Sequence, residues 1–331
     1  MSSSIPVSFP APRPVRRQSK RTRHATILGT GICVPERVVS NTYFSDELGL
    51  DTTAEWIERR IGIIQRHWAT DETSTDLAVG AARSALLNSG VDPQEIDVVI
   101  VATSTPDYTM PATACLVQGR IGATHALAFD VVNACAGYAY ALDAASRYLQ
   151  NGDLQTALVI GVDRGSRLVD PRDRTTSVFF GDGAGAAVVS NQGAGRVLAS
   201  KLYSSGNAEP LSVPVGGTMA MDGKAIWKFA TEVLPSTVNE LCREAGVSVN
   251  DIKLLVPHQA NRNILSAAAE KMGLPFERVV VNIERYGNTL AGSIPIALDE
   301  ALANGRAESG DLVAMVGFGA GLAWAGLLLQ L

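Results

Sequence analysis

The chain has 331 residues, of which 46% are hydrophobic and 18% charged, and its formal net charge at pH 7 is −5. This composition indicates a globular protein with enough apolar residues for two domains of ordinary size, and it excludes a disordered chain or a disulfide-rich scaffold. No apolar stretch approaches the roughly 20 residues that span a bilayer, so we expect no membrane partner.

The N-terminal segment, 1–24, is basic. It contains six Lys or Arg, several Pro and Ser, and no acidic residue. Because it lacks the apolar segment of a secretory signal, we expect a disordered extension over 1–24, with an organellar transit segment or a nucleic-acid-binding arm as alternatives. Removing these six positive charges from the net charge of −5 leaves −11, which disfavours binding to nucleic-acid phosphates. We therefore expect no nucleic-acid partner.

Beyond the extension, helical and strand patterns alternate. Residues 76–89 have an amphipathic pattern that ends at Gly90, a favoured C-cap. Three short apolar runs are typical of strands buried on both faces: residues 98–101, 126–131 and 157–161. Residues 181–185 predict a glycine-rich turn that closes this first half. The polar, glycine-rich stretch 191–195 predicts the boundary between an N-terminal half, 25–191, and a C-terminal half, 192–331.

The second half repeats the first. Three pairs of segments match in the same order and at a nearly constant offset: residues 89–101 with 245–257, 141–144 with 297–300, and 152–154 with 310–312. A second glycine-rich turn, at 317–321, closes the second half. These matches indicate an internal duplication. The sequence therefore predicts an α/β protein built from layered α/β/α/β/α units with two related mixed sheets.

Cys135 follows the strand pattern at 126–131 and precedes a helical pattern at 141–145. Near a helix N-terminus, free N–H groups and the helix dipole favour thiolate over thiol, which makes Cys135 a candidate nucleophile. A buried structural cysteine is the alternative. Under the offset of the repeat Cys135 corresponds to Ala291, so only the first half carries a thiol here.

The second half offers His258, just after a strand pattern, and Asn288, in a Gly-Asn-Thr turn. If a pseudo-twofold axis relates the halves, strand ends from both converge on one site, and these residues form one constellation with Cys135. The four cysteines lie far apart, without a CxxC pair or a neighbouring His. We therefore expect neither a zinc cluster nor a disulfide framework, and a reducing cytoplasm fits.

Residues 133–137, 256–261 and 287–289 resemble the Cys-His-Asn triad motifs of the β-ketoacyl-acyl-carrier-protein synthase III family. Residues 51–57 and 181–187 also match that family's pattern, and the likeness runs from about Ala25 to Leu331. The resemblance implies the thiolase fold and an acyltransferase that condenses an acyl-CoA primer with malonyl-acyl-carrier protein, initiating fatty acid synthesis without a metal or redox cofactor.

The resemblance also implies a role for each triad residue. Cys135 would form the acyl-enzyme, while His258 and Asn288 would donate hydrogen bonds to the malonyl thioester oxygen as CO₂ leaves. The backbone N–H groups of Cys135 and Gly321 would form the oxyanion hole.

Further roles follow by motif position. Trp56 and Arg174 resemble the pair that sandwiches the adenine of CoA. The remaining implied positions are CoA contacts at Thr52, Arg60 and Asn261, an acyl pocket at Met110, Gly165 and Trp227, and carrier-protein docking at Lys228, Arg262 and Lys271. Asn263 and Glu270 depart from the family pattern, which often has Arg and Lys there. The family is homodimeric, with a loop of one subunit closing the acyl pocket of the other.

Several alternative functions share some of these sequence features. A Cys-His-Asn condensing enzyme of secondary metabolism, of polyketide or quinolone type, would use the same triad on another acceptor. Gly29 and Gly31 after an apolar run suggest a dinucleotide-dependent oxidoreductase, but a third glycine is missing and Pro35 interrupts the helix that should follow. A non-catalytic acyl-CoA-binding protein would not need an intact triad. Asn288 argues against Cys-His-His elongating synthases, and the lack of a cysteine in 317–321 argues against degradative thiolases.

Overall fold

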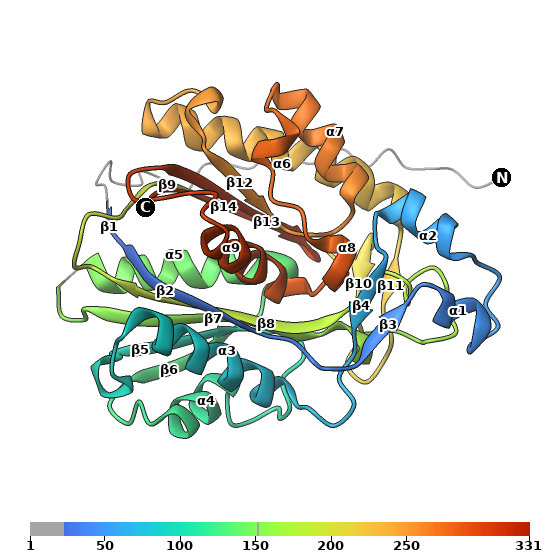
Figure 1. The fold of residues 1–331 in the computed structure, drawn as a ribbon, viewed down its shortest axis with the longest axis horizontal. Helices are drawn as coiled ribbons and strands as arrows, with labels where there is room; N and C mark the ends of the chain where they lie inside the picture. Colours follow the sequence, from blue (N-terminus) through green and yellow to red (C-terminus); the bar gives the residue numbers. More distant parts are fainter. Residues whose placement is uncertain (1–22, 151) are drawn as a thin grey trace.

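The computed structural model describes residues 23–150 and 152–331, which build two five-stranded mixed sheets (Figure 1). The first sheet has the order β2-β8-β7-β5-β6, with β2 (Thr26–Cys33), β5 (Val98–Ala102), β6 (Leu127–Val131), β7 (Thr156–Arg164) and β8 (Asp182–Ser190). The second has the order β1-β9-β14-β13-β12, with β1 (Arg23–His24), β9 (Arg196–Asn207), β12 (Leu254–Pro257), β13 (Leu312–Gly319) and β14 (Gly321–Gln330).

Helices fill three further layers. Between the sheets lie α5 (Gly137–Gln150) and α9 (Ser293–Ala303), whose apolar side chains form one core with the inner faces of both sheets (Figure 1). The outer face of the first sheet is covered by α3 (Ser74–Ser89) and α4 (Thr113–Ile121), and that of the second by α6 (Gly223–Ala245) and α7 (Arg262–Met272). The predicted α/β fold with an α/β/α/β/α layering is confirmed.

Smaller elements gather at one end of the layers, on the right in Figure 1. These are β3 (Val38–Ser40), α1 (Thr42–Asp46), α2 (Ala54–Ile61), β4 (Gln65–His67), the hairpin of β10 (Leu211–Ser212) and β11 (Ala220–Met221), and α8 (Ile283–Tyr286). Among the described residues, none of the helices combines the length and apolarity that crossing a membrane requires.

The duplication extends to the strand register. In the first sheet Val98 of β5 pairs with Ala157 of β7, and in the second Leu254 of β12 pairs with Val313 of β13. The sequence separation between Val98 and Leu254 is the same as that between Ala157 and Val313. It also equals the separation between Cys135 and Ala291. The two sheets therefore repeat one strand arrangement residue by residue.

The predicted boundary of the N-terminal extension is two residues too late. Residues 1–22 of that prediction lie outside the described part of the chain, but Arg23 and His24 form β1, which pairs with β9. The Arg23 guanidinium also makes an ion pair of 2.8 Å with Asp143 of α5, and both side chains are buried. Arg23 is therefore part of the second sheet, and its charge is neutralised by Asp143.

The predicted glycine turn at 181–185 is wrong, whereas the turn at 317–321 does join β13 to β14. Residues 182–185 instead begin β8, which pairs with β2 and β7. Its glycines allow close approach of the second half. A Cβ on Gly181 would lie 2.1 Å from the carbonyl oxygen of Tyr286, and one on Gly185 would lie 2.7 Å from the nitrogen of Ile296.

Candidate active site

The three predicted triad residues line one cavity of about 920 Å³, which is bordered by both halves of the chain. Cys135 comes from the turn before α5, His258 from the end of β12, and Asn288 from the segment between α8 and α9. Gly321, predicted as an oxyanion-hole residue, lines the same cavity at the start of β14. Segments from both halves thus bring residues far apart in sequence to one site.

Cys135 lies in a short 3₁₀ turn (Ala134–Ala136) between β6 and α5. The preceding residue, Ala134, has a φ of +44°, a left-handed conformation that costs an alanine about 1–2 kcal/mol. The thiol is 5% exposed and packs with apolar side chains that form a lining around it: Val169, Phe180, Met219 and Leu290. These residues give the sulfur apolar surroundings.

The resting thiol is neutral. Burial raises the pKa of Cys135 because it disfavours the charged thiolate, and the nearby Asp163 carboxylate raises it further. The helix N-terminus lies where the sequence predicted it, and burial of the thiol opposes the stabilisation of a thiolate expected from that position.

His258 is also neutral. Only 1% of it is exposed, and burial lowers its pKa to about 3. Nδ1 lies 2.7 Å from the hydroxyl oxygen of Ser293, which also accepts the N–H of Gln259 at 3.4 Å. The ring meets Phe318 edge to face, with centroids 5.3 Å apart. The imidazole is therefore held from two sides.

Asn288 is fixed by its backbone and by its side-chain oxygen. Its N–H donates to the carbonyl of Phe179 at 2.9 Å, and its carbonyl accepts from the N–H of Gly181 at 3.0 Å. The side-chain Oδ1 accepts the N–H of Leu290 at 2.9 Å. No acceptor within the described residues binds Nδ2, so the amide nitrogen is the group left to donate into the cavity.

The predicted CoA residues cluster around α2. A cavity of about 400 Å³ is lined by Thr52, Trp56 and Arg174, and the Arg174 guanidinium lies 5.2 Å from the Trp56 ring centroid. A planar ring stacked between them would need about 7 Å, two layers of van der Waals contact, so the present spacing leaves no room for one. Asn261 lines the triad cavity, and its Nδ2 donates to the carbonyl of Arg60 at 3.1 Å. This bond links the two predicted contact residues.

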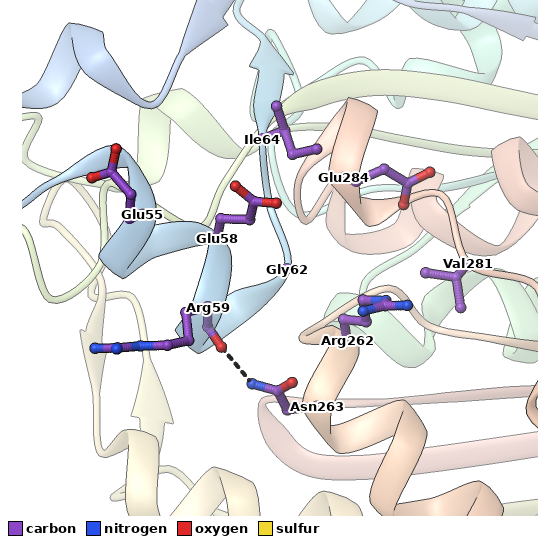
Figure 2. Close-up of a pocket in the computed structure, with 9 residues that line it drawn as sticks. All are labelled: Glu55, Glu58, Arg59, Gly62, Ile64, Arg262, Asn263, Val281 and Glu284. Carbon is purple, nitrogen blue, oxygen red and sulfur yellow. Dashed lines mark hydrogen bonds between the residues drawn. The ribbon is translucent and has the colours of Figure 1, made fainter.

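Another cavity, of about 720 Å³, lies between α2 and the start of α7 (Figure 2). It contains no triad residue. Asn263 donates from Nδ2 to the carbonyl of Arg59 at 3.1 Å, the bond drawn in Figure 2, so this residue joins α7 to α2. Arg262 lines the same cavity, with its guanidinium 5.7 Å from the Phe276 ring centroid.

The predicted docking cations do not share one face. Lys271 and Arg262 are two and a half turns apart along α7, which places them on opposite sides of the helix. The Nζ of Lys271 contacts the carbonyl oxygen of Thr231 on α6 at 3.4 Å, close to the exposed Lys228. Lys228 and Lys271 therefore lie on neighbouring helices, and Arg262 faces α2.

The predicted acyl-pocket residues are placed differently from one another. Trp227 lines the triad cavity at 39% exposure, whereas Met110 is 79% exposed and does not line the cavity of its own chain. Gly165 does not line it either. A Cβ there would lie 2.9 Å from side-chain atoms of Leu290 and Phe180, so these two side chains fill the space beside the glycine and its missing side chain adds no room to the cavity.

Two functional candidates were missed in the sequence. Ser293 begins α9 shortly after Asn288, and a hydroxyl so close to a motif asparagine was the available signal. Asp163 is fully buried at the end of β7, and a lone acidic residue inside an apolar strand pattern was its signal. Neither lies in a motif that the resemblance supplied.

Comparisons with known proteins identify the family of the chain. A sequence model of 3-oxoacyl-[acyl-carrier-protein] synthase III matches residues 129–206, and the model of its C-terminal part matches residues 242–331. The curated β-ketoacyl-[acyl-carrier-protein] synthase III of Aquifex aeolicus is 43% identical over 306 residues, which are 92% of this chain and 98% of the relative.

Solved structures extend the likeness to the fold. The crystal structure of 3-oxoacyl-[acyl-carrier-protein] synthase III from Aquifex aeolicus VF5 has a TM-score of 0.90 at 42% identity and covers 94% of this chain and 100% of that one. The priming β-ketosynthase of the R1128 polyketide pathway has a TM-score of 0.87 at 36% identity, covering 96% and 99%. The thiolase-like fold and the family resemblance are confirmed, and the chain belongs to the β-ketoacyl-[acyl-carrier-protein] synthase III family.

Proposed function

We propose that this protein is an acyltransferase that joins an acyl-CoA primer to malonyl-acyl-carrier protein and so initiates fatty acid synthesis. The observation that carries the proposal is the meeting of Cys135, His258 and Asn288 in one largely apolar cavity of a chain that belongs to this family. The chemistry depends on a polarised thioester, so it requires no metal or redox cofactor.

The first step transfers the primer to the enzyme. The sulfur of Cys135 forms a bond to the acyl carbon, the bond from that carbon to the sulfur of CoA breaks, and the thiol proton ends on the departing CoA. The N–H groups of Cys135 and Gly321 hold the oxyanion during this exchange. The apolar side chains around the sulfur receive the acyl chain. In a separate cavity beside α2, Trp56, Arg174 and Thr52 hold the CoA nucleotide, with Arg60 and Asn261 as further contacts.

The second step forms the carbon–carbon bond. Malonyl thioester loses CO₂, and the electron pair of the broken bond becomes an enolate that attacks the acyl carbon on Cys135. The bond from that carbon to the Cys135 sulfur then breaks, β-ketoacyl-carrier protein is released, and the Cys135 thiolate takes up a proton from water to restore the thiol. Asn288 donates from Nδ2 to the thioester oxygen as charge develops on it. His258 donates from Nε2. This tautomer follows if the Ser293 hydroxyl, which accepts the Gln259 N–H, donates its own hydrogen to Nδ1.

Two protein partners belong to the proposal. Acyl carrier protein docks at the face that carries Lys228 and Lys271 on the neighbouring helices α6 and α7, whereas Arg262, on the other side of α7, lies apart from this face. A second copy of the chain completes a homodimer across β6, the edge strand of the first sheet. Leu127 on that strand is 53% exposed and Val132 just beyond it is 75% exposed, and an apolar edge of this kind favours pairing with another strand.

The cytoplasm is the proposed location, because all four cysteines are free and the nucleophile has to stay reduced. We favour fatty acid synthesis over a polyketide pathway. The priming β-ketosynthase of the R1128 pathway is 36% identical to this chain, against 43% for the curated Aquifex aeolicus synthase III.

Mass spectrometry of the intact protein tests the proposal. The protein is mixed with single acyl-CoAs, and malonyl-acyl-carrier protein is added to the products. We expect a mass increase of one acyl group on Cys135, followed by its loss and the appearance of β-ketoacyl-carrier protein. No mass increase with any acyl-CoA, or an acyl group that malonyl-acyl-carrier protein does not remove, would contradict the proposed function.

A further inference from the structure

The two halves contain the same strained turn. Ala134 has a φ of +44° and Leu290, its counterpart in the second half, has a φ of +46°; among the described residues these are the two non-glycine positions with positive φ. The turns close in the same way, with Ala136 N–H bound to the carbonyl of Asn133 at 3.2 Å and Gly292 N–H bound to that of Thr289 at 2.9 Å. Cys135 and Ala291 therefore hold the same place in two copies of one backbone turn.

Each turn rests on a strand of the opposite half. Gly161 of β7 lies against the Ala291 turn, since a Cβ there would be 2.2 Å from the Ala291 carbonyl oxygen. Gly317 of β13 lies against the Cys135 turn, since a Cβ there would be 2.8 Å from the Cys135 carbonyl oxygen. The repeat seen in the strand register thus continues into the contacts between strands and turns.

Two positions further along these strands the copies differ. The side chain of Asp163 closes the second turn, because its Oδ2 accepts the N–H of Ala291 at 3.0 Å, while Oδ1 accepts the N–H of Ser104 at 2.7 Å and the hydroxyl of Thr105 at 3.0 Å. The corresponding position is Gly319. A Cβ there would lie 3.1 Å from both the nitrogen and the sulfur of Cys135.

The Cys135 N–H is consequently left open. No acceptor of another described residue binds it, and Gly319 lines the cavity beside it. An N–H with no partner in a buried site is available to a substrate oxygen. At the second turn the same N–H position already holds a negatively charged oxygen, that of Asp163.

On the basis of the proposed function, we propose that Gly319 is the residue that keeps the catalytic turn open, and that the thioester oxygen occupies at Cys135 the place that a carboxylate oxygen of Asp163 occupies at Ala291. Asp163 is then a positioning residue. It anchors the N–H of Ala291 next to the N–H of Leu290, which holds the side-chain oxygen of Asn288. One copy of the turn binds substrate, and the other copy supports the asparagine.

Gly319→Ala tests the open turn. The added methyl group enters the space in front of the Cys135 nitrogen and sulfur, so we expect the burst of CoA release from acyl-CoA to slow by about 100-fold, as for loss of one oxyanion donor. Gly119→Ala is the matched control, because a Cβ at Gly119 on α4 meets open space, and it should acylate at the wild-type rate. A Gly319→Ala enzyme that acylates within about threefold of wild type would overturn the proposal.

Asp163→Asn independently tests the second turn, in which Asp163 binds the N–H of Ala291. If Gly319→Ala does not fold, this variant still tests the proposed difference between the two turns. The amide keeps the shape but cannot accept from all its present donors. We expect malonyl decarboxylation to fall at least about tenfold, because the support of Asn288 is weakened, while acylation does not slow, because the Cys135 N–H stays open. The pH profile of Cys135 alkylation by iodoacetamide should also move to lower pH, since a negative charge beside the thiol is removed.

Acylation slowed as much as decarboxylation, or neither rate changed, would overturn the role of Asp163. The wild-type enzyme separates these results from the proposed function. If it releases no CoA from any acyl-CoA, the proposed function fails; if it does and the variants behave otherwise than stated, only the inference about the two turns fails.

Discussion

Nδ1 of His258 lies 2.7 Å from the hydroxyl oxygen of Ser293, the first residue of α9, so a residue outside the triad fixes the direction of the imidazole. We expect Ser293→Ala to lower the rate of malonyl decarboxylation roughly tenfold or more, because the neutral ring can then adopt the tautomer that has no proton on Nε2. Acyl-enzyme formation should change little. The comparison is made with Ser236→Ala, an exposed serine on α6. Equal effects of the two variants would contradict this role.

Cys135→Ser should abolish acyl-enzyme formation and condensation. A serine hydroxyl is far less nucleophilic than a thiol, and no adjacent strong base activates it in this cavity. The measurement is the mass of the intact variant after exposure to acyl-CoA, together with its condensation rate. Condensation at a substantial fraction of the wild-type rate would falsify the assignment of the nucleophile.

His258→Ala and Asn288→Ala should separate the two steps. Both variants keep the thiol and its apolar surroundings, so we expect them to release CoA in a burst. Malonyl decarboxylation should fall by roughly 10²-fold or more, as for the loss of one oxyanion donor. A variant that fails to acylate yet still decarboxylates malonyl thioester would show that the roles are divided differently.

Neutral His258 also gives stability a dependence on pH. Its pKa is about 3 in the folded protein, against about 6.5 for an ordinary histidine, so between these values the unfolded chain binds a proton that the folded chain does not. This contribution is complete above about pH 6.5 and is lost as the pH falls. Burial raises the pKa of Asp163 to about 6, which works in the opposite direction between about pH 3.8 and 6.

The histidine contribution is isolated by comparing wild type with His258→Gln in urea denaturation. The glutamine does not titrate, so the difference in the free energy of unfolding should shift in favour of wild type as the pH rises from 4 to 6.5, by up to about 1.4 kcal/mol per pH unit. Asp163 is present in both proteins and its effect cancels. A difference that stays constant over this range would mean that His258 is not held neutral by the fold.

Parts of this fold and site were readable in the sequence for physical reasons. Strands such as β5 and β12 are buried on both faces, so they appear as short apolar runs, and the repetition of these runs at a constant offset revealed the duplication. Other features depend on contacts that no local pattern contains. A glycine needed for close packing, such as Gly185, looks the same in sequence as a glycine in a turn, and the desolvation that raises the pKa of Cys135 comes from residues distant in the chain.

Arg23 begins β1 and forms a buried ion pair with Asp143 of α5. Deleting residues 1–22 should leave turnover within about twofold of wild type, whereas Arg23→Ala should lower the free energy of unfolding by about 3 kcal/mol because it removes one partner of a buried ion pair. The value is at the low end for such pairs, since Arg147 still contacts Asp143 at 2.6 Å. Urea denaturation measures it, and an effect below about 0.5 kcal/mol, typical of surface substitutions, would contradict the structural role of the pair.

The position of Met110 predicts which acyl-CoA primers the enzyme prefers. It lies in the loop that, by resemblance to the family, closes the acyl pocket of the other subunit, and its 79% exposure in the single chain agrees with a side chain reserved for a partner. Acetyl-specific members carry phenylalanine at this position, and methionine is more flexible and fills space adaptably. Gly165 does not enlarge the acyl pocket, because Leu290 and Phe180 occupy the space beside it. The argument therefore depends on Met110 and on Met219, a second adaptable side chain packed near the thiol.

We expect primers of at least four carbons to be used with a higher kcat/KM than acetyl-CoA, since each extra buried methylene adds up to about 0.8 kcal/mol of binding. The experiment compares acetyl-, isobutyryl-, butyryl- and octanoyl-CoA on wild type and on Met110→Phe. The phenylalanine should shift preference back towards acetyl without changing the rate at which iodoacetamide alkylates Cys135, because the substitution reduces the far end of the pocket and leaves the thiol as it is. A strong preference of wild type for acetyl-CoA would overturn the pocket argument. An unchanged preference in Met110→Phe would place the determinant elsewhere in the lining, with Met219 as the next side chain to replace.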